Sequence, residues 1–146
     1  LKSVIEINRD QPLQMIKLIK RQFSDLEALR VSVLGMAFKP GTDDVRDSAS
    51  MVVIQALMDA GCIITAFDPR AQKKGQELIG ENAISYADSL EACVENADVV
   101  LLMTSWPEFK ELPKILRKTS PSPLFVDGRR FIDKSMVANY LGIGLS

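Results

Sequence analysis

Short apolar runs alternate with segments of helical periodicity along this chain, and this alternation restricts the fold more than any other feature. Residues 31–36, 62–69 and 98–105 are β-branched or uniformly apolar, and each is followed by a polar loop and a segment of helical spacing. The last run, DVVLLMTS, lacks polar alternation, which is typical of strands covered on both faces. The pattern therefore predicts βαβ crossovers and a Rossmann-like three-layer α/β/α fold with a mainly parallel sheet.

The remaining elements follow from the same periodicity and from turn residues. An Asp-Pro turn closes the run 62–69. Asp47 or Ser48 is expected to cap the helix that follows the first strand, and Asp88 or Ser89 a later one. We expect helices over 49–61, 70–80, 88–97 and 133–140, a helix broken by Pro113 over 107–118, and strands over 83–86 and 123–130.

Residues 1–29 have a different pattern, that of a long connecting helix. Apolar side chains recur at helical spacing over 13–23, and most basic residues fall outside that stripe. Pro12 is expected to kink or restart this helix, with Asn8 or Asp10 as a cap. The Rossmann-like domain is then expected over the rest of the chain, 30–146.

Length, charge and hydropathy limit the possible partners. The chain has 146 residues and a net charge of −1, so no general field attracts nucleic acid or an anionic membrane surface. No apolar run approaches the roughly 20 residues of a membrane span, and no signal-peptide pattern is present. We therefore expect neither nucleic acid nor a membrane as partner. Because the chain begins with Leu1 rather than methionine, we expect it to be a piece of a longer polypeptide.

Cysteine and histidine usage excludes several kinds of chemistry. The chain has no histidine and only two cysteines, Cys62 and Cys93, whose spacing fits no metal site. This composition removes most zinc sites and every nucleophile activated by an imidazole base. We interpret both cysteines as small buried residues with free thiols, which suit a reducing cytoplasm. We expect neither a catalytic residue nor a metal site in this chain.

A charged loop, GMAFKPGTDDVRDS, occupies residues 35–48, directly after the first predicted strand. Pro40 keeps the backbone of Lys39 extended, which gives its ammonium group a defined direction. Arg46 lies just before the predicted helix start, where the helix dipole favours an anion. A planar guanidinium at this place is suited to bind a phosphate through two hydrogen bonds.

Other interpretations of these charges stay open. The aspartates of the loop, Asp43, Asp44 and Asp47, can simply pair with Lys39 and Arg46 to stiffen the turn, and both interpretations can hold together. Neither the dinucleotide fingerprint nor the P-loop motif is present, so any bound nucleotide must be held mostly by side chains from several loops.

Two further strand ends carry candidate ligand-binding groups. Arg129 follows a strand and a glycine, where a solvated surface role is the alternative. Trp106 and Phe109, near a third strand end, are able to stack on a base, but packing against the rim of the sheet is the alternative.

The motif blocks GMAFKPGTDDVRDS, ADVVLLMTSWPEF and FVDGRR resemble the C-terminal domain of the UDP-glucose/GDP-mannose dehydrogenase family. The likeness runs from about residue 3 to about residue 135, and the INRDQP segment resembles the end of the family's central dimerising helix. The resemblance implies an NAD-dependent enzyme that oxidises the C6 hydroxyl of a nucleotide sugar twice. It also implies a homodimer, with the NAD-binding domain and the catalytic cysteine on other parts of the same polypeptide.

The resemblance also implies roles for single residues of this chain. Phe38 and Lys39 would contact the UDP-sugar, and Arg46 would reach the NAD. Arg129 would contact the nucleotide sugar, with Arg130 as a weaker candidate for the same contact. The family's cysteine motif is absent from this sequence, so this piece alone should be inactive.

The identity of the sugar is less determined than the family. TSWPEF looks like the version found in members that act on UDP-glucose. The alternatives are a domain that binds UDP-N-acetylhexosamine or GDP-mannose, and a non-catalytic nucleotide-sensing module. A Rossmann-like fold with a functionless charged loop is the plainest alternative.

Overall fold

The computed structural model describes residues 2–143, with side chains from residue 12 onward. Its strands form one sheet of order β3-β2-β1-β4-β5-β6 in which every neighbouring pair is parallel. The predicted α/β fold is confirmed. The strands are β1 Arg30–Leu34, β2 Ile63–Phe67, β3 Ser85–Tyr86, β4 Val99–Leu102, β5 Leu124–Asp127 and β6 Tyr140–Gly142.

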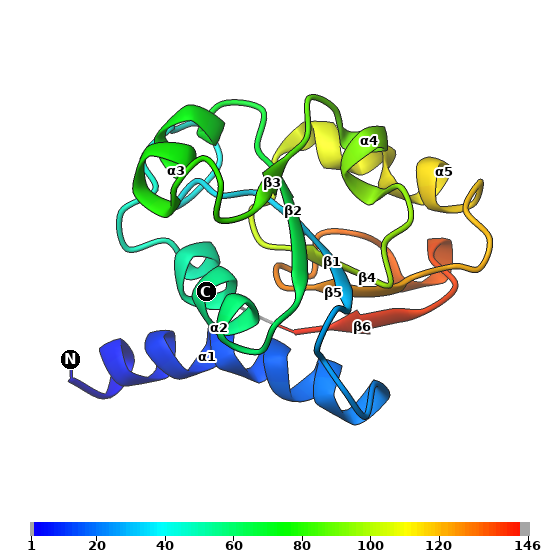
Figure 1. The fold of residues 1–146 in the computed structure, drawn as a ribbon, viewed down its shortest axis with the longest axis horizontal. Helices are drawn as coiled ribbons and strands as arrows, with labels where there is room; N and C mark the ends of the chain where they lie inside the picture. Colours follow the sequence, from blue (N-terminus) through cyan, green and yellow to red (C-terminus); the bar gives the residue numbers. More distant parts are fainter. Residues whose placement is uncertain (1, 144–146) are drawn as a thin grey trace.

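Helices cover both faces of the sheet and complete the three layers (Figure 1). α1 packs against α2 on one face, and α4 packs against α5 on the opposite face. The helices are α1 Lys2–Gln22, α2 Ala49–Asp59, α3 Gln72–Ile79, α4 Leu90–Val94 and α5 Leu112–Leu116, with short 3-10 helices η1 Pro107–Glu111 and η2 Lys134–Met136.

The core is continuous from the central strands into α1. All four residues of β4 are buried, as its unbroken apolar run predicts for a strand covered on both faces. Met15, Ile16 and Ile19 of α1 belong to the same buried cluster. The second half of α1 is therefore packed as part of this body rather than standing apart from it.

The predicted course of the first helix was wrong in its end and in its cap. α1 ends at Gln22, short of the predicted end, and it continues through Pro12, so of the two alternatives predicted there the restart does not occur. Neither expected cap, Asn8 or Asp10, starts it. Proline costs a helix interior about 3 kcal/mol, whereas each buried aliphatic side chain returns about 1.5–3 kcal/mol. Burial of the turns around Met15 thus outweighs the local penalty.

The last predicted helix, over 133–140, was also wrong. Only η2 forms, capped by Asp133, and the chain then enters β6. The Tyr140 ring packs on Phe125 with centroids 5.7 Å apart, and its hydroxyl donates to Asp127 at 2.9 Å. These contacts come from β5 and so carry no local signal in the sequence.

The other predicted helices are confirmed, together with their caps. Ser48 caps α2 and Ser89 caps α4, each accepting a backbone N–H with its hydroxyl. The segment 107–118 is broken as expected, with Pro113 in the first turn of α5.

Candidate functional site

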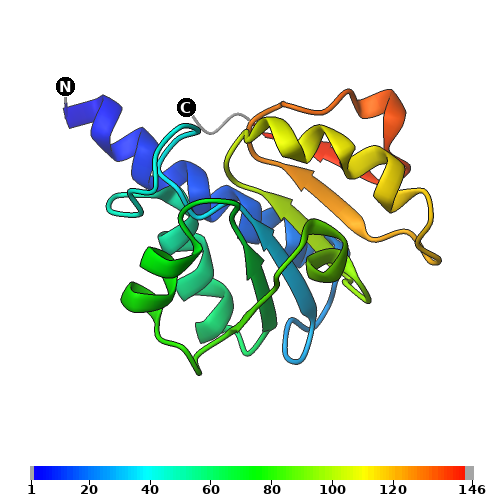
Figure 2. The ribbon, with the colours of Figure 1, turned by 90° about the horizontal axis from the view of Figure 1, so that it is seen from above.

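The carboxyl edge of the sheet gathers the loops singled out by their charge. From β1 the chain adds β2 and β3 toward one edge of the sheet, and it then returns to add β4, β5 and β6 toward the other edge. Doubly wound folds bind ligands at such a switch point, which here lies between β1 and β4. The loops after β1, β4 and β5 all leave this edge because the strands are parallel. Figure 2 shows the first of them, in cyan, projecting beyond the strand ends.

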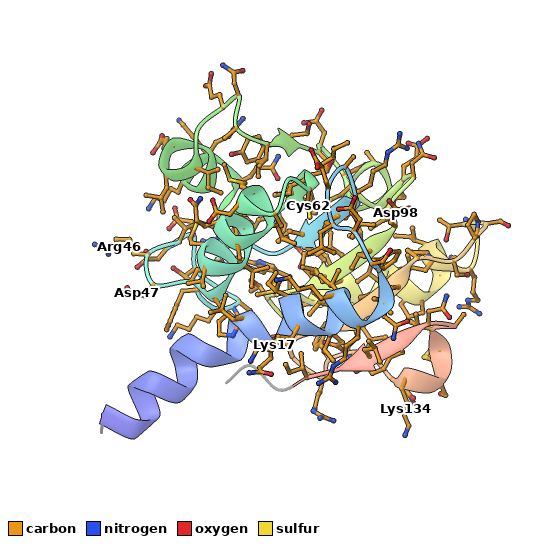
Figure 3. The ribbon with its side chains drawn as sticks, turned by 60° about the horizontal axis from the view of Figure 1, so that its bottom comes forward. Lys17, Arg46, Asp47, Cys62, Asp98 and Lys134 are labelled. Carbon is orange, nitrogen blue, oxygen red and sulfur yellow. The ribbon has the colours of Figure 1, made fainter. Side chains whose placement is uncertain are left out.

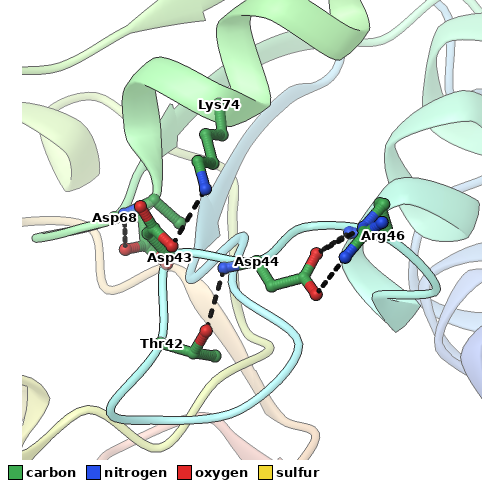
Figure 4. A network of polar contacts seen from close by, with 7 residues as sticks. Thr42, Asp43, Asp44, Arg46, Asp68 and Lys74 are labelled. Atoms are coloured by element: carbon green, nitrogen blue, oxygen red, sulfur yellow. Dashed lines mark hydrogen bonds and ion pairs between the residues drawn. The ribbon is translucent and has the colours of Figure 1, made fainter.

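The projecting loop, residues 38–47, is held by its own backbone. The Phe38 N–H donates to the Asp44 carbonyl at 2.7 Å and closes the loop at its base. The Asp44 N–H donates to Thr42 Oγ1 at 3.1 Å, and Gly41 supplies the positive φ of +89° that the turn requires (Figure 4). The conformation of the loop is therefore fixed by hydrogen bonds within the loop.

Only part of the expected pairing inside the loop forms. Arg46 donates from Nε and Nη2 to the two Asp44 carboxylate oxygens, both at 3.2 Å, although its side chain is 84% exposed. These hydrogen bonds lower the pKa of Asp44. Asp43 instead pairs with Lys74 of α3 at 3.1 Å (Figure 4). Among residues 12–143, the Lys39 ammonium has no ionic or hydrogen-bonding partner.

Phe38 and Lys39 begin the exposed part of the loop. The Phe38 side chain is 50% exposed, although it directly follows the buried residues Met36 and Ala37. The exposed Phe38 ring and the exposed Lys39 ammonium are therefore both accessible to solvent at this turn.

The structure separates the two adjacent arginines that follow β5. Arg129 is half-buried, and its Nε donates to the Met103 carbonyl at 2.7 Å, at the end of β4. Burial lowers the pKa of its guanidinium. Asp127, fully buried, accepts the Arg129 N–H at 3.0 Å and fixes the turn. Arg130 is exposed, with a φ of +50°.

The aromatic residues after β4 pack inside the protein. Trp106 is 5% exposed and Phe109 is fully buried, so neither ring presents a face for stacking on a base. The Trp106 Nε1–H donates to the carboxylate of Asp68 at 3.0 Å. The alternative interpretation of these residues, packing at the rim of the sheet, is confirmed.

Sequence reasoning missed Asp68 and Asp127, two buried carboxylates that organise this edge. Each directly follows the last apolar residue of a strand, β2 and β5 respectively. An acidic residue at the end of a buried strand was the available signal, but the sequence does not show which groups bind it.

The remaining features bear on the chemistry that this part of the chain can perform. Cys93 is buried as predicted, but Cys62 is only partly buried. Desolvation raises the pKa of the Cys93 thiol to about 12 and also raises that of Cys62, so both are poor nucleophiles. Within the described residues, no three metal-ligating side chains gather, and no helix is long and apolar enough to cross a membrane. A hollow of about 630 Å³ lies between the charged loop and α3, lined by Thr42, Asp43, Asp44, Val45, Arg46, Lys74, Glu77 and Leu78.

These observations define a doubly wound α/β domain of the Rossmann-like class, with an anchored charged loop at its switch point. Residues 32–134 match the sequence model of the UDP-glucose/GDP-mannose dehydrogenase family, UDP binding domain. The chain belongs to this family.

Individual relatives agree with this assignment. The chain is 39% identical over 140 residues to UDP-glucose 6-dehydrogenase AglM of Haloferax volcanii, covering 96% of this chain and 32% of that protein. It is 39% identical over 125 residues to UDP-glucose 6-dehydrogenase of Rhizobium meliloti, covering 85% and 28%. The structure of a UDP-glucose dehydrogenase from Pyrobaculum islandicum matches with a TM-score of 0.80 at 27% identity, covering 99% and 31%. The chain thus spans about a third of the length of these relatives.

Proposed function

We propose that this chain is the UDP-binding part of a UDP-glucose 6-dehydrogenase, which oxidises UDP-glucose to UDP-glucuronate with two NAD. The family assignment and the names of the relatives support this proposal. The rest of the enzyme, including the NAD-binding domain and the catalytic cysteine, would lie on other parts of the same polypeptide. The enzyme would act as a cytoplasmic homodimer, and the free thiols of Cys62 and Cys93 suit that compartment.

The observation that carries the proposal is the placement of Lys39. Its ammonium is exposed and unpaired among residues 12–143, on a loop closed at its base by the Phe38 backbone. Arg129 leaves the same edge of the sheet from β5. We propose that these two cations bind the diphosphate and that Phe38 contacts the nucleotide sugar. Arg129 is favoured over Arg130 because its guanidinium is anchored at the end of β4.

The residues of this domain do not fit a dinucleotide site of their own. The dinucleotide fingerprint is absent from the sequence, and a Cβ added at Gly35 would lie 2.5 Å from Thr104 Cβ, so Thr104 leaves no room for a ligand atom directly beside Gly35. The NAD would therefore be held mainly by another part of the polypeptide. Arg46, whose exposed guanidinium already grips one anionic group, would contact the NAD from this side.

Titration calorimetry of the full-length protein, combined with NADH formation measured by absorbance, tests this proposal. Binding of UDP-glucose with NAD-dependent turnover is the expected result. Preference for a UDP-N-acetylhexosamine or GDP-mannose would identify a different member of the family. Nucleotide binding without turnover of any of these sugars would indicate a sensing module and contradict the enzymatic proposal.

A further inference from the structure

Asp68 is a buried carboxylate that joins three segments at the carboxyl edge. It follows β2, and only 3% of its surface is exposed. Burial of an ionised group is costly unless hydrogen bonds satisfy it, so its partners show what the residue does.

Five N–H groups satisfy the two oxygens of Asp68. Oδ2 accepts from the Met36 backbone at 2.7 Å, the Ala37 backbone at 2.9 Å and Trp106 Nε1 at 3.0 Å. Oδ1 accepts from the backbones of Arg70 and Ala71 at 2.8 and 2.7 Å. Only the ionised carboxylate accepts at both oxygens without presenting a proton to another donor.

These hydrogen bonds fix the residues that lead directly into Phe38 and Lys39. Ala37 is held at both backbone groups, because its carbonyl accepts from Thr104 Oγ1 at 2.9 Å while its N–H donates to Asp68. Trp106, in the loop after β4, donates its Nε1–H to the same carboxylate. The direction in which the chain leaves β1 therefore depends on Asp68.

The usual role of an acidic residue in a Rossmann fold is excluded by these contacts. In dinucleotide-binding domains, an acidic residue downstream of the glycine-rich turn binds the ribose hydroxyl of the cofactor. Here both oxygens of Asp68 already accept protein N–H groups. The carboxylate is used to shape the edge and not to contact a nucleotide.

We infer that Asp68 is a positioning residue for nucleotide-sugar binding, acting through the Met36–Ala37 backbone on Phe38 and Lys39. This inference rests on the proposed function, since it presumes that Lys39 binds the diphosphate. An amide at this position cannot accept all five N–H groups, because its NH₂ would face donors.

The test compares Asp68→Asn with Asp98→Asn in the full-length enzyme. Asp98 is the control because it also accepts a backbone N–H, from Arg30 at 2.9 Å, but directly precedes β4, whereas Asp68 follows the end of β2. Figure 3 shows Asp98 on the side of the molecule away from Arg46 of the charged loop. Asp68→Asn is expected to raise the KM for UDP-glucose about tenfold, with kcat at saturating sugar and the KM for NAD unchanged. Asp98→Asn is expected to change none of the three.

Trp106→Phe keeps the inference testable if Asp68→Asn fails to fold, since it removes one donor and keeps an aromatic ring. A KM for UDP-glucose raised about threefold, without loss of kcat, supports the positioning role. The role of Asp68 would be overturned if the KM values are unchanged in every folded variant while Lys39→Ala still raises the KM for UDP-glucose. That result would leave the proposed function standing. Absence of UDP binding by the unsubstituted enzyme would instead contradict the proposed function.

Discussion

Lys39 and Arg46 stand on the same loop, but their surroundings differ. Arg46 is paired through two hydrogen bonds with Asp44, whereas Lys39 has no partner among residues 12–143. The Lys39 ammonium is therefore available to a ligand without first breaking an ion pair within this part of the chain. At Arg46 a ligand must compete with Asp44, or bind while that pair persists.

Lys39→Ala in the full-length enzyme is expected to raise the KM for UDP-glucose about tenfold, because a charge-assisted hydrogen bond to the diphosphate is lost. Steady-state kinetics at saturating NAD measure this effect. Lys134→Ala is the control, since Lys134 is an exposed lysine far from the charged loop (Figure 3). A normal KM in the Lys39 variant would contradict the role proposed for this residue.

Arg46→Ala is expected to weaken the binding of NAD more than the binding of UDP-glucose, since we propose that this guanidinium contacts the cofactor. The KM values for both substrates, each measured with the other saturating, provide the ranking. Arg21→Ala removes an exposed arginine from the end of α1 and should change neither value. The reverse ranking at Arg46 would show that the two roles are exchanged.

At the scale of elements, the connection between β5 and β6 depends on one buried carboxylate. Asp127 accepts from the backbone of Ile132 at 2.8 Å and from the Tyr140 hydroxyl at 2.9 Å. Burial, followed by this hydrogen bond, raises the pKa of Tyr140 to about 12 from an ordinary 10. The neutral phenol thus links the edge strand β6 to the turn that carries Arg129.

The stability of the domain should fall in alkali through Tyr140. Because its pKa is higher in the folded than in the unfolded chain, its contribution is complete below pH 10 and is lost as the pH rises towards about 12. Tyr140→Phe is expected to lower the free energy of unfolding by about 1 kcal/mol below pH 10 and to reduce the decline above it. Urea unfolding across this pH range measures both effects. Burial also raises the pKa of Tyr86, but this residue is present both in the unsubstituted protein and in the Tyr140→Phe variant. The difference between their free energies of unfolding at each pH therefore reports the contribution of Tyr140.

At the scale of the whole molecule, the two halves of the sheet meet at Gly35 and Thr104. Gly35 has a φ of +99°, and an added Cβ would lie 2.5 Å from Thr104 Cβ and 2.7 Å from its backbone nitrogen. The Ser50 hydroxyl donates to the Gly35 carbonyl at 2.6 Å and ties the start of α2 to the same point. The seam between β1 and β4 is therefore closed by packing.

Gly35→Ala and Gly41→Ala form a matched pair that tests this seam. Both glycines have positive φ, but a Cβ at Gly41 meets nothing within 4 Å. Gly41→Ala is expected to lower the free energy of unfolding by about 1 kcal/mol, and Gly35→Ala by about 2–5 kcal/mol, because only the latter adds a collision to the backbone strain. Unfolding followed by the fluorescence of Trp106, the single tryptophan of this chain, measures both. Equal losses would mean that the seam tolerates a methyl group.

Much of the architecture was predictable from local patterns, and parts of the site were not. The apolar runs that became β1, β2, β4 and β5 were visible, as were the caps Ser48 and Ser89. Lys39 could be predicted as a candidate site residue because it belongs to the charged loop motif that follows the first strand. Asp68 was not, because two of its donors, Met36 and Trp106, lie 32 and 38 residues away along the chain. β6 was missed for the same reason, since its partners belong to β5.

The sequence by itself determined the layered parallel sheet, because an unbroken apolar strand such as β4 must be covered on both faces. It also determined the family, because the charged motif after β1 is long and specific. Tertiary structure alone decided that Arg46 pairs with Asp44 while Lys39 stays unpaired among residues 12–143, and that Arg129 is anchored while Arg130 is exposed. Such pairings depend on which groups the fold brings within hydrogen-bonding distance, and spacing along the chain does not encode that distance.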